Sequence, residues 1–156
     1  MTTMTKKANT EADSVLNGLI ETLKDGELGF KTAAEDVKSR EIKQVLKQYS
    51  VQRAEFARAL QAQVERRGEK AEDSGTVAGA LHRGWITLKS SVVSRDTLAV
   101  LEECEQGEDY AVKAYREALA GQHLDGTRSL VEGQYAHIRA AHDHVRKLRD
   151  SLKPAA

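Results

Sequence analysis

Three glutamates fall at positions where the helical pattern of the sequence calls for an apolar residue. Glu27 lies within the apolar stripe of residues 10–38, and Glu105 and Glu108 lie within the stripe of residues 94–120. A carboxylate placed among apolar side chains is costly unless it is protonated, paired with a cation or bound to a metal. The chemistry to consider is therefore metal binding or a buried ion pair.

Four amphipathic segments must position these carboxylates. Apolar residues recur at three- and four-residue spacing over residues 10–38, 39–67, 94–120 and 125–152, which predicts four helices. Only about three residues separate the first two segments, which predicts an antiparallel hairpin. The stretch from Gly68 to Asp96 is long enough to run the length of a bundle, and it includes a short predicted helix around Trp85, the only tryptophan.

The two halves of the chain contain similar motifs in the same order. Gly26-Glu27 matches Gly107-Glu108, and Gln48-Tyr49 with Arg53 matches Gln134-Tyr135 with Arg139. A duplicated helical hairpin joined by a long crossover predicts an all-α, ferritin-like four-helix bundle. We expect a disordered tail over residues 1–9, a single bundle over residues 10–152 and a short tail over residues 153–156.

A metal site is one interpretation of the inward carboxylates. In a duplicated bundle Glu27 and Glu108 face each other, as two ligands of a di-iron site do, but the Glu-x-x-His motifs of the other two helices are missing. The remaining possibility is a gapped site for iron or another divalent metal, with Glu105 and His142 as auxiliary ligands.

A buried ion pair is the competing interpretation and needs no cofactor. Arg53 lies on the apolar side of residues 39–67, where it could pair with Glu27 or Glu108. Tyr49 and Gln134 lie on the apolar sides of their helices and are expected to join the buried polar contacts. No catalytic residue is predicted.

Composition excludes several function classes. The 24 basic and 24 acidic residues leave no net field to attract nucleic acid or an anionic membrane surface. No apolar run is long enough for a membrane span or a secretory signal, so we expect a cytoplasmic protein. The single cysteine excludes an intramolecular disulfide and a multi-thiolate zinc site.

Three stretches resemble a family of small bacterial ferritin-like four-helix proteins known as a domain of unknown function. The stretches are Leu19 to Glu27 with Phe30, Ala80-Leu81-His82-Arg83-Gly84-Trp85, and Cys104-Glu105-Gln106-Gly107-Glu108 with Lys113-Ala114-Tyr115. The resemblance covers about residues 14–150, and it implies a ferritin-like fold without an assigned activity. Of the metal ligands of true ferritins, it carries over only Glu27 and Glu108.

The sequence therefore favours a protein that is not an enzyme and that binds no cofactor. We expect it to act through self-association, as a homodimer or other homo-oligomer, or through contacts with another protein, with stress physiology as the setting. The alternative is a metal-binding or di-iron oxidoreductase that uses the core glutamates.

Overall fold

The computed structural model describes residues 2–73, 75, 85, 96–124 and 126–153, and all regular structure within these ranges is helical. The helices are α1 (Thr2–Asp36), α2 (Arg40–Arg66), α4 (Thr97–Ala120) and α5 (Arg128–Leu152). The predicted all-α four-helix bundle is confirmed. None of the described helices is both long and apolar enough to span a bilayer.

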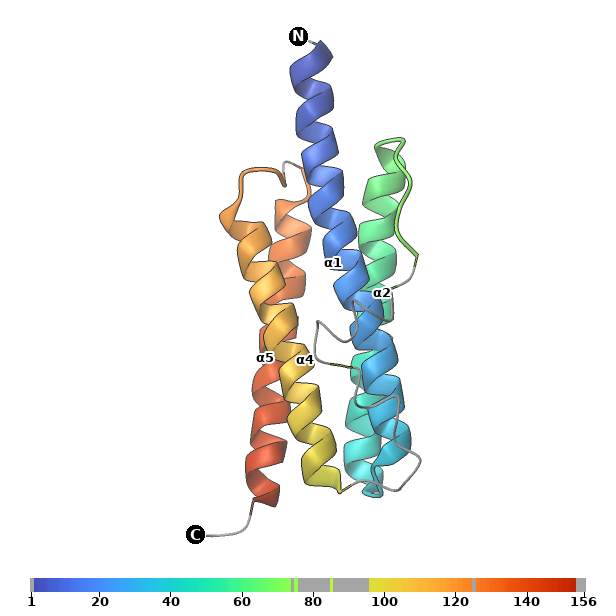
Figure 1. Ribbon diagram of the computed structural model, residues 1–156, viewed down its shortest axis with the longest axis vertical. Helices are drawn as coiled ribbons and strands as arrows, with labels where there is room; N and C mark the ends of the chain where they lie inside the picture. The colour runs from blue at the N-terminus through green and yellow to red at the C-terminus, as the bar shows by residue number, and fades with distance from the viewer. Residues whose placement is uncertain (1, 74, 76–84, 86–95, 125, 154–156) are drawn as a thin grey trace.

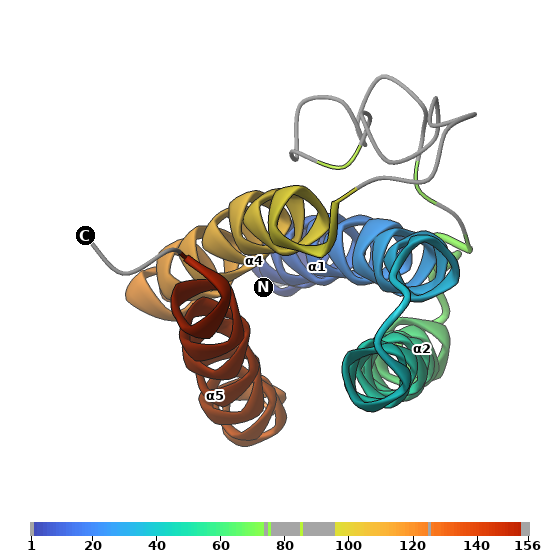
Figure 2. The ribbon, with the colours of Figure 1, turned by 90° about the horizontal axis from the view of Figure 1, so that it is seen from below.

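Helices α1 and α4 form the middle of the bundle, and α2 and α5 lie on the same side of this pair (Figures 1 and 2). The extensive interhelical packing joins α1 to α2, α4 to α5, and α1 to α4. The two hairpins thus meet mainly through their first helices, while α2 and α5 diverge (Figure 2).

Local signals in the sequence explain most helix boundaries. The Ser39 side chain caps α2 by accepting a hydrogen bond from the Ile42 amide at 3.3 Å, and Asp96 caps α4 through the Leu98 amide. Gly68 follows the end of α2 with a φ of 80°, a conformation that glycine adopts without steric cost.

The structure describes the N-terminal segment but little of the crossover between α2 and α4. Helix α1 begins at Thr2, so the segment expected as a disordered tail over residues 1–9 is helical in the structure from its second residue. The short helix expected around Trp85 lies outside the described residues, of which only Gly75 and Trp85 belong to the central part of the crossover.

Trp85 is buried against the α1–α4 pair, with 3% of its surface exposed. Its ring centroid lies 5.2 Å from that of Phe30, in an edge-on arrangement. A Cβ atom at Gly29 or Gly107 would approach the indole to 2.1 or 2.0 Å, so both glycines are required for this close approach. The prediction that Trp85 anchors the crossover on the bundle therefore holds. Gly29 and Gly107 leave the space that its indole ring occupies.

Asp13 is a buried carboxylate inside α1. Its side chain is 7% exposed, its oxygens receive no hydrogen bond from the described part of the chain, and its nearest cation is Arg67, with 3.8 Å between Nε and Oδ1. Burial raises the pKa of Asp13, while attraction to Arg67 opposes the shift and repulsion from Glu69 adds to it. The folded chain therefore binds a proton at Asp13 more tightly than the unfolded chain does.

Replacing Asp13 by Asn is expected to stabilise the protein at pH 7 by about 1 kcal/mol, because it removes the cost of burying an incompletely paired charge. Since the folded-state pKa is raised, this cost is present above that pKa and disappears as the pH falls below the unfolded value. Thermal unfolding at pH 7 and below about pH 4 measures the difference between the two chains. Glu117→Gln, at an exposed acid, is the control; an equal gain in both variants at pH 7 would contradict the prediction.

Candidate functional site

A buried ion pair between α2 and α4 occupies the middle of the core. Arg53 Nη1 donates to Glu108 Oε1 at 2.5 Å, and Nη2 donates to Oε2 at 2.8 Å. The Arg53 and Glu108 side chains are 1% and 0% exposed. The guanidinium carbon also lies 5.2 Å from the centroid of the Phe30 ring, where the π face attracts a cation. Both charges are thus compensated by groups of the chain itself.

The pair divides the apolar core into two clusters. On α2, buried Leu46 belongs to one cluster and Ala57 to the other, with Arg53 between them. On α4, Cys104 and Ala111 flank Glu108 in the same way. The ion pair therefore lies at the level where each of these helices passes from one cluster to the other.

Helix α1 presents Gly26 to the ion pair. A Cβ atom added to Gly26 would lie 3.5 Å from Cγ of Arg53, which is an ordinary van der Waals contact. The arginine stem therefore passes close to the backbone of α1, but it does not strictly require a glycine there.

Glu27 does not face Glu108, so its predicted place in the core is wrong. Its side chain is 26% exposed and receives a hydrogen bond of 2.9 Å from Lys24 on the same helix. The residue that α1 turns toward the pair is the preceding Gly26. Since Glu108 is already paired in a bidentate manner with Arg53, the described residues at this level do not fit a di-iron site.

Further polar contacts join α4 to α5 and α2 to α5. The Tyr115 hydroxyl donates to Gln134 Oε1 at 2.7 Å, and Gln134 Nε2 donates to the Phe56 carbonyl at 3.2 Å. Tyr49 is half-buried, and its hydroxyl lies 2.6 Å from His144 Nδ1. Burial raises the pKa of Tyr115, so its hydroxyl stays neutral and serves as a donor. Of the predicted polar partners, Gln134 is buried, while Tyr49 pairs near the surface.

Cys104 is fully buried next to the level of the ion pair. Burial raises the pKa of its thiol, and repulsion from Glu108 raises it further. The reactive form of cysteine is the thiolate, so this environment suppresses nucleophilic chemistry. The interpretation of Cys104 as a small core residue agrees with this placement.

The other two predicted metal ligands meet on the flank of α4 and α5. Glu105 pairs with Arg149 and, at 3.7 Å, with Arg146. His142 Nε2 lies 2.5 Å from Asp109 Oδ1. One ligand atom from each of Glu105, Asp109 and His142 lies within 4.8 Å of the others. The structure thus brings Glu105 and His142 together, but not with Glu27 or Glu108.

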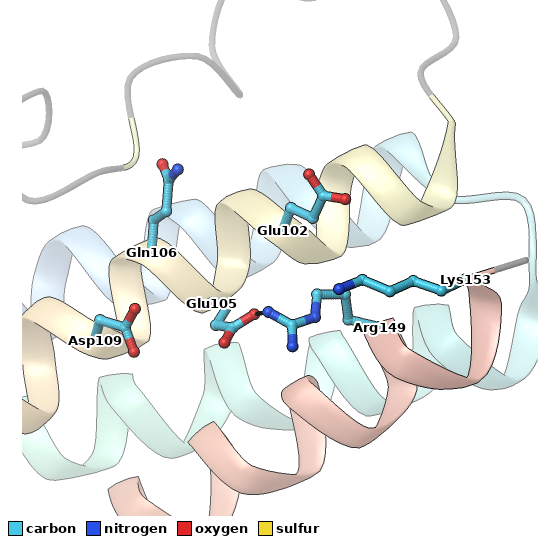
Figure 3. Close-up of a pocket in the computed structure, with 6 residues that line it drawn as sticks. All are labelled: Glu102, Glu105, Gln106, Asp109, Arg149 and Lys153. Carbon is cyan, nitrogen blue, oxygen red and sulfur yellow. Dashed lines mark hydrogen bonds and ion pairs between the residues drawn. The ribbon is translucent and has the colours of Figure 1, made fainter. Parts of the chain in front are cut away.

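Figure 3 shows the groove that opens beside this cluster. It has a volume of about 390 Å³ and is lined by residues of α4 and the end of α5: Glu102, Glu105, Gln106, Asp109, Arg149 and Lys153. Glu105 points toward Arg149, and Asp109 lies one turn further along α4 (Figure 3). Asp109 was missed in the sequence because it lies outside the apolar stripe; its spacing of four residues from Glu105 is the available signal.

The duplicated pattern of the sequence does not extend to the side-chain environments. Arg53 is buried, whereas its counterpart Arg139 is exposed and stacks over Tyr135, with its Cζ 5.6 Å from the ring centroid. Glu108 is buried, whereas its counterpart Glu27 is not. The two hairpins thus use matching motifs for different contacts.

The fold and the mid-core pair define the class of protein: an all-α four-helix bundle whose centre is held together by an arginine and a glutamate. A family model described as "Domain of unknown function (DUF2383)" matches residues 11–121, and the chain belongs to this family. The match confirms the resemblance to a domain of unknown function, over α1, α2 and α4. No curated protein matches the chain.

Proposed function

We propose that the chain is a non-enzymatic, ferritin-like bundle of the cytoplasm that acts by associating with a second copy of itself. The non-enzymatic role is supported by the bidentate Arg53–Glu108 pair, both members of which are at most 1% exposed. It occupies the core level where a ferritin-like bundle holds its metals, and it leaves no unpaired carboxylate among the described residues there.

The side of the bundle formed by α2 and α5 supports association with a second copy. An apolar groove of about 390 Å³ runs between α2 and α5, lined by Phe56, Ala59, Ser129, Leu130, Gly133, Gln134 and His137. In helical proteins such an apolar face is normally buried against another helix. A second copy presents the same pair of helices, so a twofold arrangement can cover both grooves at once. Because the formal net charge is zero, two copies approach each other without overall repulsion.

Ala59→Arg tests the groove, because a long charged side chain there would have to be desolvated in the dimer. Light scattering after size exclusion, over a range of protein concentrations, is expected to show a dimer for the wild-type chain and a monomer for the variant. Helicity should stay unchanged, since Ala59 is only partly buried and arginine is a good helix former.

Ala120→Arg provides the matched control, since Ala120 is exposed at the end of α4 and does not line the groove. It should retain the wild-type oligomeric state. A wild-type chain that stays monomeric at all concentrations, or a dimer that survives Ala59→Arg, would rule out this mode of association.

A further inference from the structure

We propose that Glu105, Asp109 and His142 form a binding site for a single divalent transition-metal ion on the flank of α4 and α5. One imidazole nitrogen and two carboxylates suit zinc, manganese, iron(II) or cobalt(II) and leave coordination positions open to water. The site is separate from the mid-core pair and from the α2–α5 groove, so metal binding can be tested independently of self-association.

The ligand atoms are already gathered in the structure. Glu105 and Asp109 are one turn apart on α4, so their carboxylates share a face, and His142 reaches them from α5. One oxygen or nitrogen from each residue lies within 4.8 Å of the others, and His142 Nε2 is 2.5 Å from Asp109 Oδ1. A metal bound between them would replace the contact of His142 with Asp109 and the pairing of Glu105 with Arg149.

The second nitrogen of His142 has the partner that a metal-binding histidine requires. His142 Nδ1 lies 3.3 Å from Asp143 Oδ1, so a proton on Nδ1 can be donated to that carboxylate. Because two lone pairs cannot face each other at 2.5 Å, a proton lies between Nε2 and Asp109 Oδ1 in the metal-free chain, and a metal bound by Nε2, Asp109 and Glu105 would take the place of that proton. A carboxylate behind the imidazole fixes its orientation and increases its basicity toward a metal.

Arg149 is the cation that now occupies part of the site. It donates to Glu105 and also to Asp150 Oδ1, at 2.8 Å from Nη2. A metal ion that takes Glu105 therefore displaces an arginine that retains a second carboxylate partner. The groove of Glu102, Gln106 and Lys153 beside this pair lets an ion reach Glu105 from solvent (Figure 3). Arginine and metal compete for the same carboxylate.

Titration of the chelator-treated full chain with Co²⁺ tests the site, using visible absorption and calorimetry. We expect saturable binding of one ion per chain. Asp109→Asn, at a 61% exposed side chain that the fold does not require, and His142→Ala should each weaken binding at least about tenfold. Arg149→Gln should strengthen binding several-fold, because it removes the competing cation. Zn²⁺ should raise the melting temperature of the wild-type chain but not of Asp109→Asn.

His144→Ala is the control, since His144 lies two residues away on α5 and contacts Tyr49 instead of the cluster. Its affinity for Co²⁺ should equal that of the wild-type chain. The proposal is overturned if the wild-type chain shows no saturable binding, if Asp109→Asn binds as tightly as the wild-type chain, or if His144→Ala weakens binding as much as His142→Ala. An unchanged affinity in Arg149→Gln would overturn the use of Glu105 as a ligand.

Discussion

Replacing Arg53 by Met is expected to lower the free energy of unfolding by about 3–5 kcal/mol. The variant keeps a long side chain but leaves Glu108, which is 0% exposed, as a buried carboxylate without its cation. Desolvation of a lone charge costs far more than the loss of the packing contacts of the arginine stem. Chemical denaturation at pH 7, followed by far-ultraviolet circular dichroism, measures the change.

Two comparisons separate the ion pair from a general effect of losing an arginine. Arg139→Met removes the exposed counterpart on α5 and should cost less than about 1 kcal/mol. Arg53→Met combined with Glu108→Met removes both charges and should recover most of the lost stability, since well-packed apolar replacements of buried ion pairs are often neutral. If Arg53→Met costs no more than Arg139→Met, Glu108 has another source of compensation.

Replacing Gly107 by Ala is expected to destabilise the protein by about 1–3 kcal/mol, although alanine is the better helix former. The new Cβ would lie 2.0 Å from Cε2 of Trp85, so the indole ring must move away from its packing position against α1 and α4. Gly29→Ala should act in the same direction, because its Cβ would lie 2.1 Å from Cε3 of the same ring. Since Trp85 is the only tryptophan, its fluorescence reports the displacement directly.

Gly18→Ala is the control and should change stability in the opposite direction. Gly18 is exposed in α1, and nothing lies within 4 Å of a Cβ added there, so alanine should stabilise the helix by about 0.5–1 kcal/mol. The indole emission should not move. Gly107→Ala placed in a Trp85→Ala background should no longer be destabilising; a persistent loss there would show that the indole is not the cause.

The helices could be predicted from the sequence because their signals are local. Ser39 and Gly68 mark the two ends of α2 through capping and a positive φ, both of which depend only on neighbouring residues. The apolar stripes determine which side of each helix turns inward, and they correctly placed Arg53 and Glu108 on that side. The helical start of the chain at Thr2 was missed because the first residues carry no apolar periodicity.

The partners of the charged groups could not be predicted, because they depend on the rotation of one helix against another. Successive residues of a helix point about 100° apart, so the rotation of α1 about its axis decides which of two neighbouring residues faces Arg53. In the structure this residue is Gly26, and Glu27 lies to the side, next to Lys24. The same periodicity is compatible with either arrangement. Packing of the whole core selects one of them.

The sequence by itself determined four amphipathic helices and an inward arginine, since each follows from residues close together in the chain, but the same local pattern put Glu27 as well as Glu108 on an inward side. Only the tertiary structure decided that Arg53 pairs with Glu108, that Trp85 rests on Gly29 and Gly107, and that Asp109 joins Glu105 and His142. These contacts join residues far apart in the sequence, and their geometry depends on how the helices pack, which local periodicity does not specify.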